Sequence, residues 1–489
     1  MSKIVVIGAG VGGLAAAIRL ARAGHRVVMH ERSAVVGGQL GRYQRDGFRF
    51  DTGPSLLTLP EVFADLDLDL RPQPLDPVVR HVFPDGSVLD SSSAHDVFVA
   101  RVADAFGPGA ADDWRHFWKR AGHIWAASWR SVLRRPVTPA SLAALSWRLT
   151  DLRAIAPGRS LRSLGFEYLR DWRLRMLVDR YATYAGADPR RAPAALAAIP
   201  YAELAFGGWY LPGGLGTLAD AMLTRCAGLG VEIVLDSPVT AIEAGRAVRG
   251  VRLASGTVES ADVVVANVDA LTVYRDLLPT PARLAGLADR SLGGFVLLLG
   301  VRGSTPSLAH HTVFFPHNYM AEFDAVFGDP GRGARARPPD DPAILVTRAA
   351  DDAVHPPGAE AWFVLVNAPP HGYGYRAVDW RRPGLADAYR DHVLAVLAAR
   401  GLDVRDRLIF AETRTPADLA DATAAPGGAI YGTAGGLLRP PNRGPVDGLH
   451  LVGGSTHPGG GLPMVILSAK IVADQIGPAP GPRNPLSGR

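Results

Sequence analysis

The chain has 489 residues, of which 47% are hydrophobic and 20% charged, a composition typical of globular proteins with buried cores. Its 52 basic and 47 acidic residues leave a formal net charge of +5, without a basic block interleaved with aromatic residues, so nucleic acid is not an expected partner. The single cysteine, Cys226, excludes an internal disulfide and a cysteine metal cluster, and we expect no metal site.

The N-terminal sequence enters an apolar strand pattern directly, without the charged and apolar regions of a signal peptide. The longest apolar runs, such as residues 295–301, are too short to span a bilayer. We therefore expect a cytoplasmic protein without an integral membrane anchor.

The first predicted elements form a dinucleotide-binding strand, turn and helix. An apolar strand over residues 4–7 breaks at Gly8, and a helix is predicted over 14–23. Three glycines permit the tight turn, the approach of a pyrophosphate and the packing of helix on strand: Gly8, Gly10 and Gly13. A second strand over 27–30 ends at Glu31, whose carboxylate suits a ribose diol and disfavours a 2′-phosphate. The alternative is a glycine-rich turn without a ligand.

A second glycine cluster, residues 36–42, follows Glu31 closely and is succeeded by the segment 48–55. Its backbone amides would lie along the same extended dinucleotide. The guanidinium of Arg42 suits the charge and geometry of a pyrophosphate. The alternative is an ordinary loop with a solvated arginine.

The central part of the chain changes from helix to strand patterns. Residues 71–111 contain a predicted hairpin, and residues 112–204 are predominantly helical. A Pro-Gly-Gly turn then opens a helix that ends at Gly228 or Gly230. Short strands are predicted next, over 231–235, 239–243, 248–253 and 263–266. Residues 290–420 mix strands over 295–301 and 362–367 with a helix over 385–399 and an exposed loop over 334–342.

A glycine-dense segment over 449–464 is the second strong feature. A strand ends at Gly453, a loop follows, and Pro463 occupies the first position of a helix predicted to reach residue 476. Within the loop, His457 is a candidate catalytic base, with a conformational or hydrogen-bonding role as the alternative.

These segments together resemble the family of FAD-containing enzymes that includes flavin amine oxidases, protoporphyrinogen oxidases and carotenoid desaturases. In that family the second segment lies along the FAD, and the C-terminal loop and helix N-terminus face the flavin ring. The resemblance implies an FAD bound by Gly8, Gly10, Gly12, Gly13, Glu31, Arg32, Gly37, Gly38, Gly41, Arg42, Asp51, Gly53, Pro54, Val239, Gly453, Gly454, Ser455, Gly461, Leu462, Pro463 and Met464.

Within the family, the C-terminal run resembles the signature of bacterial carotenoid desaturases. Amine oxidases usually have an acidic residue where this chain has Ser455. The segments 181–193 and 205–210 resemble the branch that acts on hydroxylated or partly desaturated carotenoids. The pair His310 and His311 also resembles a desaturase segment, and we interpret it as structural, because adjacent strand residues point to opposite faces.

The resemblance implies an FAD-dependent desaturase that introduces double bonds into an acyclic carotenoid by hydride transfer to flavin N5, with a late, 3,4-type desaturation favoured. A quinone or dioxygen would accept the electrons. The alternatives are a phytoene desaturase, a carotenoid cis–trans isomerase, a flavin amine oxidase and a non-catalytic prenyl- or lipid-binding escort protein.

The predicted fold is α/β, with a Rossmann-type FAD-binding domain, an inserted α+β substrate domain and a helical segment. The FAD domain is assigned to 1–70, 205–290 and 420–476, the substrate domain to 71–111 and 291–419, the helical segment to 112–204 and a flexible tail to 477–489.

Because a carotenoid resides in the bilayer, we expect peripheral association with the cytoplasmic membrane. Five residues of the helical segment share one arc of a helical wheel: Trp114, Trp118, Trp125, Trp129 and Val132. Basic residues occupy the other sides of this helix. Such a stripe suits a lipid headgroup interface. The alternative is that it packs on the core or lines the substrate tunnel.

Overall fold

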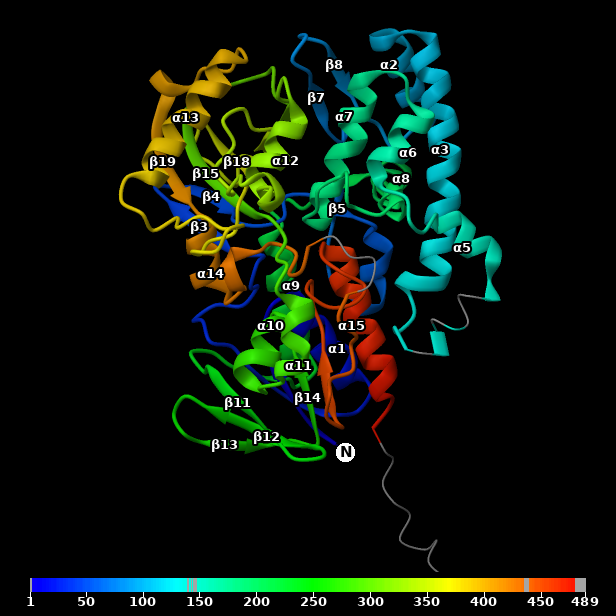
Figure 1. Cartoon of the computed structure of the whole chain (residues 1–489). Helices are drawn as coiled ribbons and strands as arrows, with labels where there is room; N and C mark the ends of the chain where they lie inside the picture. The colour runs from blue at the N-terminus through cyan, green and yellow to red at the C-terminus, as the bar shows by residue number, and fades with distance from the viewer. Residues whose placement is uncertain (1, 139, 142, 144–146, 435–438, 480–489) are drawn as a thin grey trace, which may run out of the picture.

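The computed structural model describes residues 2–138, 140–141, 143, 147–434 and 439–479. Of the predicted flexible tail, residues 480–489 lie outside the described residues. Figure 1 shows three regions: a parallel-sheet region at the bottom, a second sheet region at the upper left and a bundle of helices at the upper right.

The lower region is built on a five-stranded parallel sheet in the order β10-β2-β1-β14-β20. Its strands are β1 (Lys3–Ile7), β2 (Arg26–His30), β10 (Glu232–Val234), β14 (Val263–Ala266) and β20 (Leu449–Leu451). The predicted ranges 1–70, 205–290 and 420–476 therefore each contribute strands to one sheet.

Both faces of this sheet are covered, which explains its uninterrupted apolar strands. Ile4 and Val6 pack on one face with three helices, and Val5 and Ile7 pack on the other. The helices are α1 (Val11–Arg22), α9 (Gly216–Gly228) and α15 (Leu462–Ile476). The second face is covered by an antiparallel sheet of β11 (Val239–Ala244), β12 (Val248–Leu253) and β13 (Val258–Ser260) and by α10 (Ala270–Thr272).

The upper left region contains a seven-stranded mixed sheet in the order β19-β15-β18-β17-β16-β7-β8. Its strands are β7 (Arg80–Val82), β8 (Val88–Asp90), β15 (Gly293–Arg302), β16 (His311–Phe314), β17 (Ile344–Arg348), β18 (Ala359–Ala368) and β19 (Leu408–Arg414). On one face lies α13 (Leu385–Ala399), and on the other the hairpin of β3 (Arg42–Arg45) and β4 (Phe48–Asp51). The hairpin thus joins the cofactor segment to the second sheet.

The upper right region is helical (Figure 1). It comprises α2 (His95–Phe106), α3 (Pro108–Ser128), the π-helical turn η2 (Trp129–Leu133), α5 (Leu149–Ile155), α6 (Leu161–Tyr168), α7 (Trp172–Arg180), the 3-10 turn η3 (Tyr181–Ala185) and α8 (Ala198–Phe206). In the part of the chain that the structure describes, no helix combines the length and apolarity needed to cross a membrane.

The tryptophan stripe of α3 faces the protein. Trp114 is fully buried, with its ring centroid 5.1 Å from that of Phe98. The rings of Trp118 and Trp125 lie 4.5 and 6.5 Å from Tyr201 of α8. For these three tryptophans the structure supports the alternative of internal packing, because α2 and α8 contact their rings, and membrane contact of the helical segment stays a prediction.

Candidate functional site

A continuous cavity of about 1630 Å³ begins at the carboxyl ends of β1 and β2 and extends to the seven-stranded sheet. Sites for a single small molecule are usually about 300–1,000 Å³. The cavity therefore has room for a dinucleotide and a second long molecule.

The dinucleotide end of the cavity is made of closely packed backbone. Gly8 has a φ of +92°, and a Cβ on it would lie 2.8 Å from the carbonyl oxygen of Asn267. A Cβ on Gly13 would lie 2.1 Å from the carbonyl oxygen of Gly8. Helix α1 begins after Gly10 without a side-chain cap, so its first N–H groups are available to a phosphate.

Glu31 is held at the end of β2 with its carboxylate at the cavity wall. One carboxylate oxygen accepts a hydrogen bond from the Ala9 N–H at 2.7 Å, and the other accepts one from the Ser33 N–H at 2.9 Å. Each oxygen keeps a further acceptor position. The carboxylate is thus fixed where a ribose hydroxyl can donate to it.

The second glycine segment closes over the first. The Gly37 N–H donates to the Ala9 carbonyl at 2.9 Å. A Cβ on Gly53 would lie 1.9 Å from the Gln39 carbonyl oxygen, so only glycine fits there. Arg42 lines the cavity and donates to Asp220 at 2.6 Å, which leaves part of its guanidinium available to a diphosphate.

The C-terminal loop supplies the third wall. Gly453, with a φ of +114°, lies against Asn267, and the Ser455 hydroxyl accepts a hydrogen bond from the Ala270 N–H at 3.0 Å. Helix α15 starts after Gly461 without a side-chain cap, and Leu462 and Pro463 line the cavity. The positive end of this helix dipole therefore faces the cavity, where it favours negative charge on a bound ring.

Most of the predicted cofactor residues share this one cavity: Gly8, Gly10, Gly12, Glu31, Arg32, Gly37, Gly38, Gly41, Arg42, Gly53, Pro54, Val239, Gly453, Gly454, Ser455, Gly461, Leu462 and Pro463. Gly13, Asp51 and Met464 do not line it. Asp51 accepts hydrogen bonds from the N–H groups of Leu215 and Gly216 at 2.6 and 2.8 Å, so it anchors the start of α9.

His457 also lies outside the cavity wall and is almost fully buried. Its Nε2 is 2.8 Å from the Arg135 carbonyl oxygen and 3.2 Å from that of Val132. Burial lowers the pKa of the imidazole, which favours the neutral form. His457 thus contacts the chain around the end of η2 rather than the cavity, and its role as a catalytic base or a conformational residue stays a prediction.

The sequence analysis assigned no role to Asn267, which connects the first glycine segment with the C-terminal loop. Its side-chain amide donates to the Gly8 carbonyl at 3.2 Å. A Cβ added to Gly12 would lie 2.6 Å from its Oδ1, and one added to Gly453 would lie 2.8 Å from the same atom. The place of Asn267 directly after the β14 strand was the available signal.

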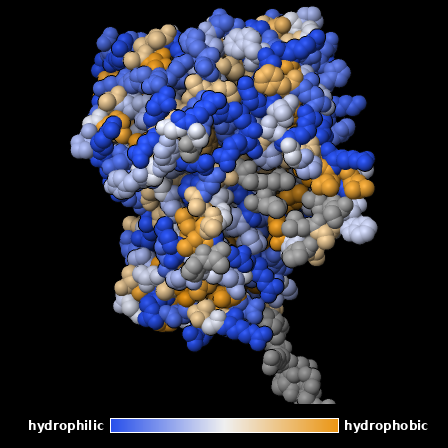
Figure 2. Space-filling model, viewed as in Figure 1, coloured by the Kyte–Doolittle hydropathy of each residue, from blue (hydrophilic) through white to orange (hydrophobic). Residues whose placement is uncertain are grey.

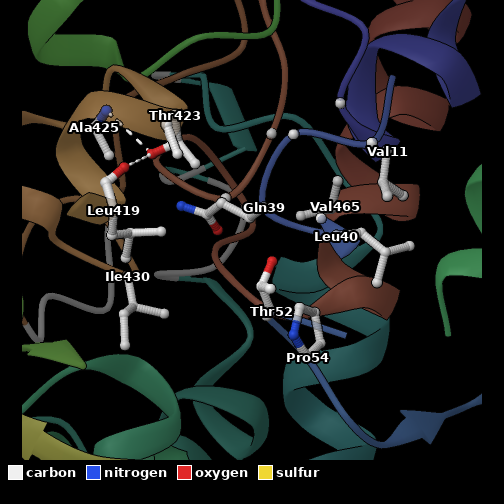
Figure 3. A pocket seen from close by; sticks show the side chains of 18 of the residues that line it. Val11, Gln39, Leu40, Thr52, Pro54, Leu419, Thr423, Ala425, Ile430 and Val465 are labelled. Atoms are coloured by element: carbon white, nitrogen blue, oxygen red, sulfur yellow. Dashed lines mark hydrogen bonds between the residues drawn. The ribbon is translucent and has the colours of Figure 1, made fainter. Parts of the chain in front are cut away.

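Figure 3 shows how the middle of the cavity is lined. Gln39, Thr52 and Pro54 lie between two apolar groups of side chains. Val11, Leu40 and Val465 form one group, and Leu419, Ala425 and Ile430 the other. The helix α14 (Pro416–Thr423) thus contributes a wall that the sequence analysis did not assign.

The sheet end of the cavity is apolar, with a cluster of polar exceptions. Its apolar lining includes Leu56, Val79, Val296, Leu345, Phe363 and Leu365. The polar exceptions are Arg180, Tyr184, His311, Tyr319, Asn367 and Tyr431. The expectation that His310 and His311 point to opposite faces is wrong: β16 begins only at His311, and the two ring centroids are 4.6 Å apart.

The parallel sheet, the uncapped helix N-termini and the fixed carboxylate of Glu31 are typical of a dinucleotide-binding α/β protein. Residues 11–296 match the family model described as flavin containing amine oxidoreductase. The chain belongs to this family, and it is an FAD-dependent oxidoreductase, as the sequence predicted.

Individual relatives match over nearly their whole length. A 4,4'-diapolycopene oxygenase from Methylomonas sp is 34% identical, covering 97% of this chain and 98% of the relative. The hydroxyneurosporene desaturase of Cereibacter sphaeroides is also 34% identical, covering 97% of each chain. A solved oxidoreductase structure from Methanosarcina mazei has a TM-score of 0.63 at 17% identity, covering 96% of this chain and 100% of that one, which supports the fold alone.

Proposed function

We propose that this protein is an FAD-dependent carotenoid desaturase that acts late in the desaturation of an acyclic carotenoid, by a 3,4-type reaction. The observation that carries the proposal is the single cavity, which joins a complete dinucleotide cleft to a long apolar chamber. The similarity to a hydroxyneurosporene desaturase supports the same class of substrate.

A bound FAD would supply the two-electron acceptor for the hydride that leaves an allylic carbon, while the neighbouring carbon loses a proton to solvent and the C=C bond forms between the two carbons. The protein's own contribution is alignment of the polyene and exclusion of water by the apolar walls. The C-terminal loop and the start of α15 would direct N–H groups and a positive dipole end into the cavity, between its dinucleotide end and its sheet end. A quinone or dioxygen would accept the electrons afterwards.

We also propose that the protein docks on the cytoplasmic membrane through α5 and Trp147, which shortly precedes it. Trp147 and Leu149 are 87% and 58% exposed. Exposed arginines lie nearby in the chain, at 134, 135, 148 and 153. Figure 2 shows apolar side chains gathered at the right-hand edge, where Figure 1 places α5. Aromatic and apolar tips with basic neighbours suit an anionic lipid surface.

Vesicle sedimentation tests this docking. The holoprotein should sediment with vesicles that contain anionic lipid, and Trp147→Ser with Leu149→Ser should reduce the bound fraction severalfold. Tyr373→Ser, at a site that is 81% exposed in another region, is the matched control and should bind normally. Equal binding of all three proteins would contradict the docking surface.

Pigment analysis tests the activity. One host should make phytoene, and a second should make lycopene and its hydroxylated derivative, each expressing this chain. Red-shifted products only in the second host would support late desaturation, whereas lycopene or neurosporene formed from phytoene would indicate a phytoene desaturase. A terminal aldehyde would indicate the oxygenase activity named for the Methylomonas relative.

A further inference from the structure

A buried cation faces the apolar end of the cavity. Arg180, the last residue of α7, is only 7% exposed and lines the cavity wall. Its Nη1 donates to the Tyr184 hydroxyl at 3.0 Å. Among the described residues, no carboxylate lies within ion-pair distance of it. Removing a guanidinium from water is costly without compensating partners, so this residue requires an explanation.

The charge of Glu203 and the neighbouring tyrosines hold the pKa of Arg180 above its ordinary value despite burial, but the groups around Arg180 keep unused hydrogen-bonding capacity. The buried Glu203 accepts a hydrogen bond from the Tyr181 hydroxyl at 2.7 Å, while its second carboxylate oxygen has no partner among the described residues. Tyr319 is almost fully buried at the cavity wall, and its hydroxyl likewise has no partner in the described part of the chain. The cavity therefore presents a donor-rich cluster with unused hydrogen-bonding capacity.

This cluster lies next to the C-terminal loop, where the family resemblance places the flavin ring. A Cβ on Gly460 would be 2.3 Å from the ring of Tyr431, which places Tyr431 against the C-terminal loop. A Cβ on Gly186, which follows η3, would lie 3.1 Å from the same ring, so Tyr431 also contacts the segment that continues from Arg180. A ligand atom bound to Arg180 would thus lie close to the reacting part of the substrate.

We propose that Arg180, with Tyr184 and Tyr319, recognises a neutral oxygen at the reacting end of the carotenoid, and so selects oxygenated substrates over hydrocarbons. This inference rests on the proposed function. A hydroxyl or carbonyl oxygen accepts from the guanidinium, and a hydroxyl can in addition donate to the Tyr319 hydroxyl. The hydroxyl carbon of a 1-hydroxycarotenoid and its 3,4-bond are close neighbours, which agrees with a cluster beside the flavin-facing loop.

Binding measurements on the FAD-loaded protein test the selection without requiring turnover. The probes are lycopene, 1-hydroxylycopene and an acyclic polyene with a terminal aldehyde, each added in detergent micelles. The wild-type protein should bind the hydroxylated probe about 10- to 100-fold more tightly than lycopene, as expected for a hydrogen bond to a charged donor.

Arg180→Met should abolish this preference while changing the Kd for lycopene little. Arg175→Met is the matched control, because Arg175 belongs to the same helix and lies over the Phe166 ring, outside the cavity wall. It should keep the preference. Arg180→Met should also weaken binding of the aldehyde probe, whereas Tyr319→Phe should weaken binding of the hydroxylated probe alone. This result would show that Arg180 binds both oxygen types and that Tyr319 binds only the hydroxyl.

Several results would overturn the inference: a wild-type protein without preference, or an Arg180→Met variant that weakens all probes equally. If Arg180→Met loses its FAD or unfolds, Tyr184→Phe replaces it as the test variant. An unchanged preference for the hydroxylated probe in Tyr184→Phe would show that the cluster does not recognise the oxygen. Turnover of either probe, measured separately, tests the proposed function. Active wild-type enzyme without a preference would therefore reject only the inference.

Discussion

At its dinucleotide end the cavity presents mainly backbone, whereas at its sheet end it presents side chains. The dinucleotide end depends on the absence of side chains, because a Cβ on Gly13 or Gly53 would collide with a carbonyl oxygen. The sheet end gathers Arg180, Tyr319 and Tyr431 from separate elements. Backbone recognition serves a cofactor that the whole family shares, while side chains can change with the substrate without disturbing the fold.

The largest effect should come from adding one methyl group to the backbone-made end. Gly13→Ala puts a Cβ 2.1 Å from the Gly8 carbonyl oxygen, and neither the helix nor the turn can move without disturbing the phosphate site. We expect a loss of about 1,000-fold or more in FAD affinity, or about 4 kcal/mol, at the upper end of overpacking effects. Equilibrium dialysis against FAD measures it.

Gly228→Ala is the matched control for this change. It lies at the end of helix α9, and a Cβ there meets nothing within 4 Å. FAD affinity should be unchanged, and the free energy of unfolding should rise by about 0.4–1 kcal/mol. Normal FAD binding by Gly13→Ala would show that the close packing of strand and helix is not what holds the cofactor.

The same contrast explains what the sequence could reveal. The glycine segments are local in sequence, so their spacing alone indicated the strand, turn and helix and most of the cavity wall around Glu31. Arg180 and Tyr319 are brought together only by folding. Periodicity likewise identified the tryptophan stripe of α3 but could not show that α8 covers it.

Asn267 offers a smaller test, because it joins the cofactor segments through one side chain. Asn267→Leu removes the amide that donates to the Gly8 carbonyl at 3.2 Å. An unsatisfied carbonyl and a disturbed contact with Gly453 should cost about 2–3 kcal/mol, or roughly 30- to 150-fold in FAD affinity. Fluorescence titration of the apoprotein with FAD measures this loss.

Asn367→Leu is the corresponding change in the substrate half. Asn367 lines the same cavity but donates to Glu322 at 2.7 Å. FAD affinity should stay within about twofold of the wild-type value, because loss of a contact far from the cofactor site should not affect that site. Similar losses of FAD affinity in Asn267→Leu and Asn367→Leu would mean that the cofactor and substrate ends of the cavity do not function independently.

The smallest expected effect is on the pH dependence of the free energy of unfolding, through one residue of the seven-stranded sheet. His81 of β7 is fully buried, its Nδ1 donates to the Leu89 carbonyl at 3.1 Å, and burial lowers its pKa to about 3. The unfolded chain takes up a proton near pH 6.5, whereas the folded chain does not. The contribution of His81 to stability is therefore present above pH 6.5 and is lost as the pH falls towards 3, by up to about 1.4 kcal/mol per pH unit.

His81→Phe removes this titration and keeps an aromatic ring beside Phe315, whose centroid lies 6.1 Å from that of His81. Between pH 7 and pH 5, the free energy of unfolding of the wild type should fall by about 2 kcal/mol more than that of the variant, because all other titrating groups are common to both. Denaturant unfolding at the two pH values measures the difference. A parallel loss in both proteins would mean that the buried imidazole reaches a proton without unfolding, through the cavity that its region encloses.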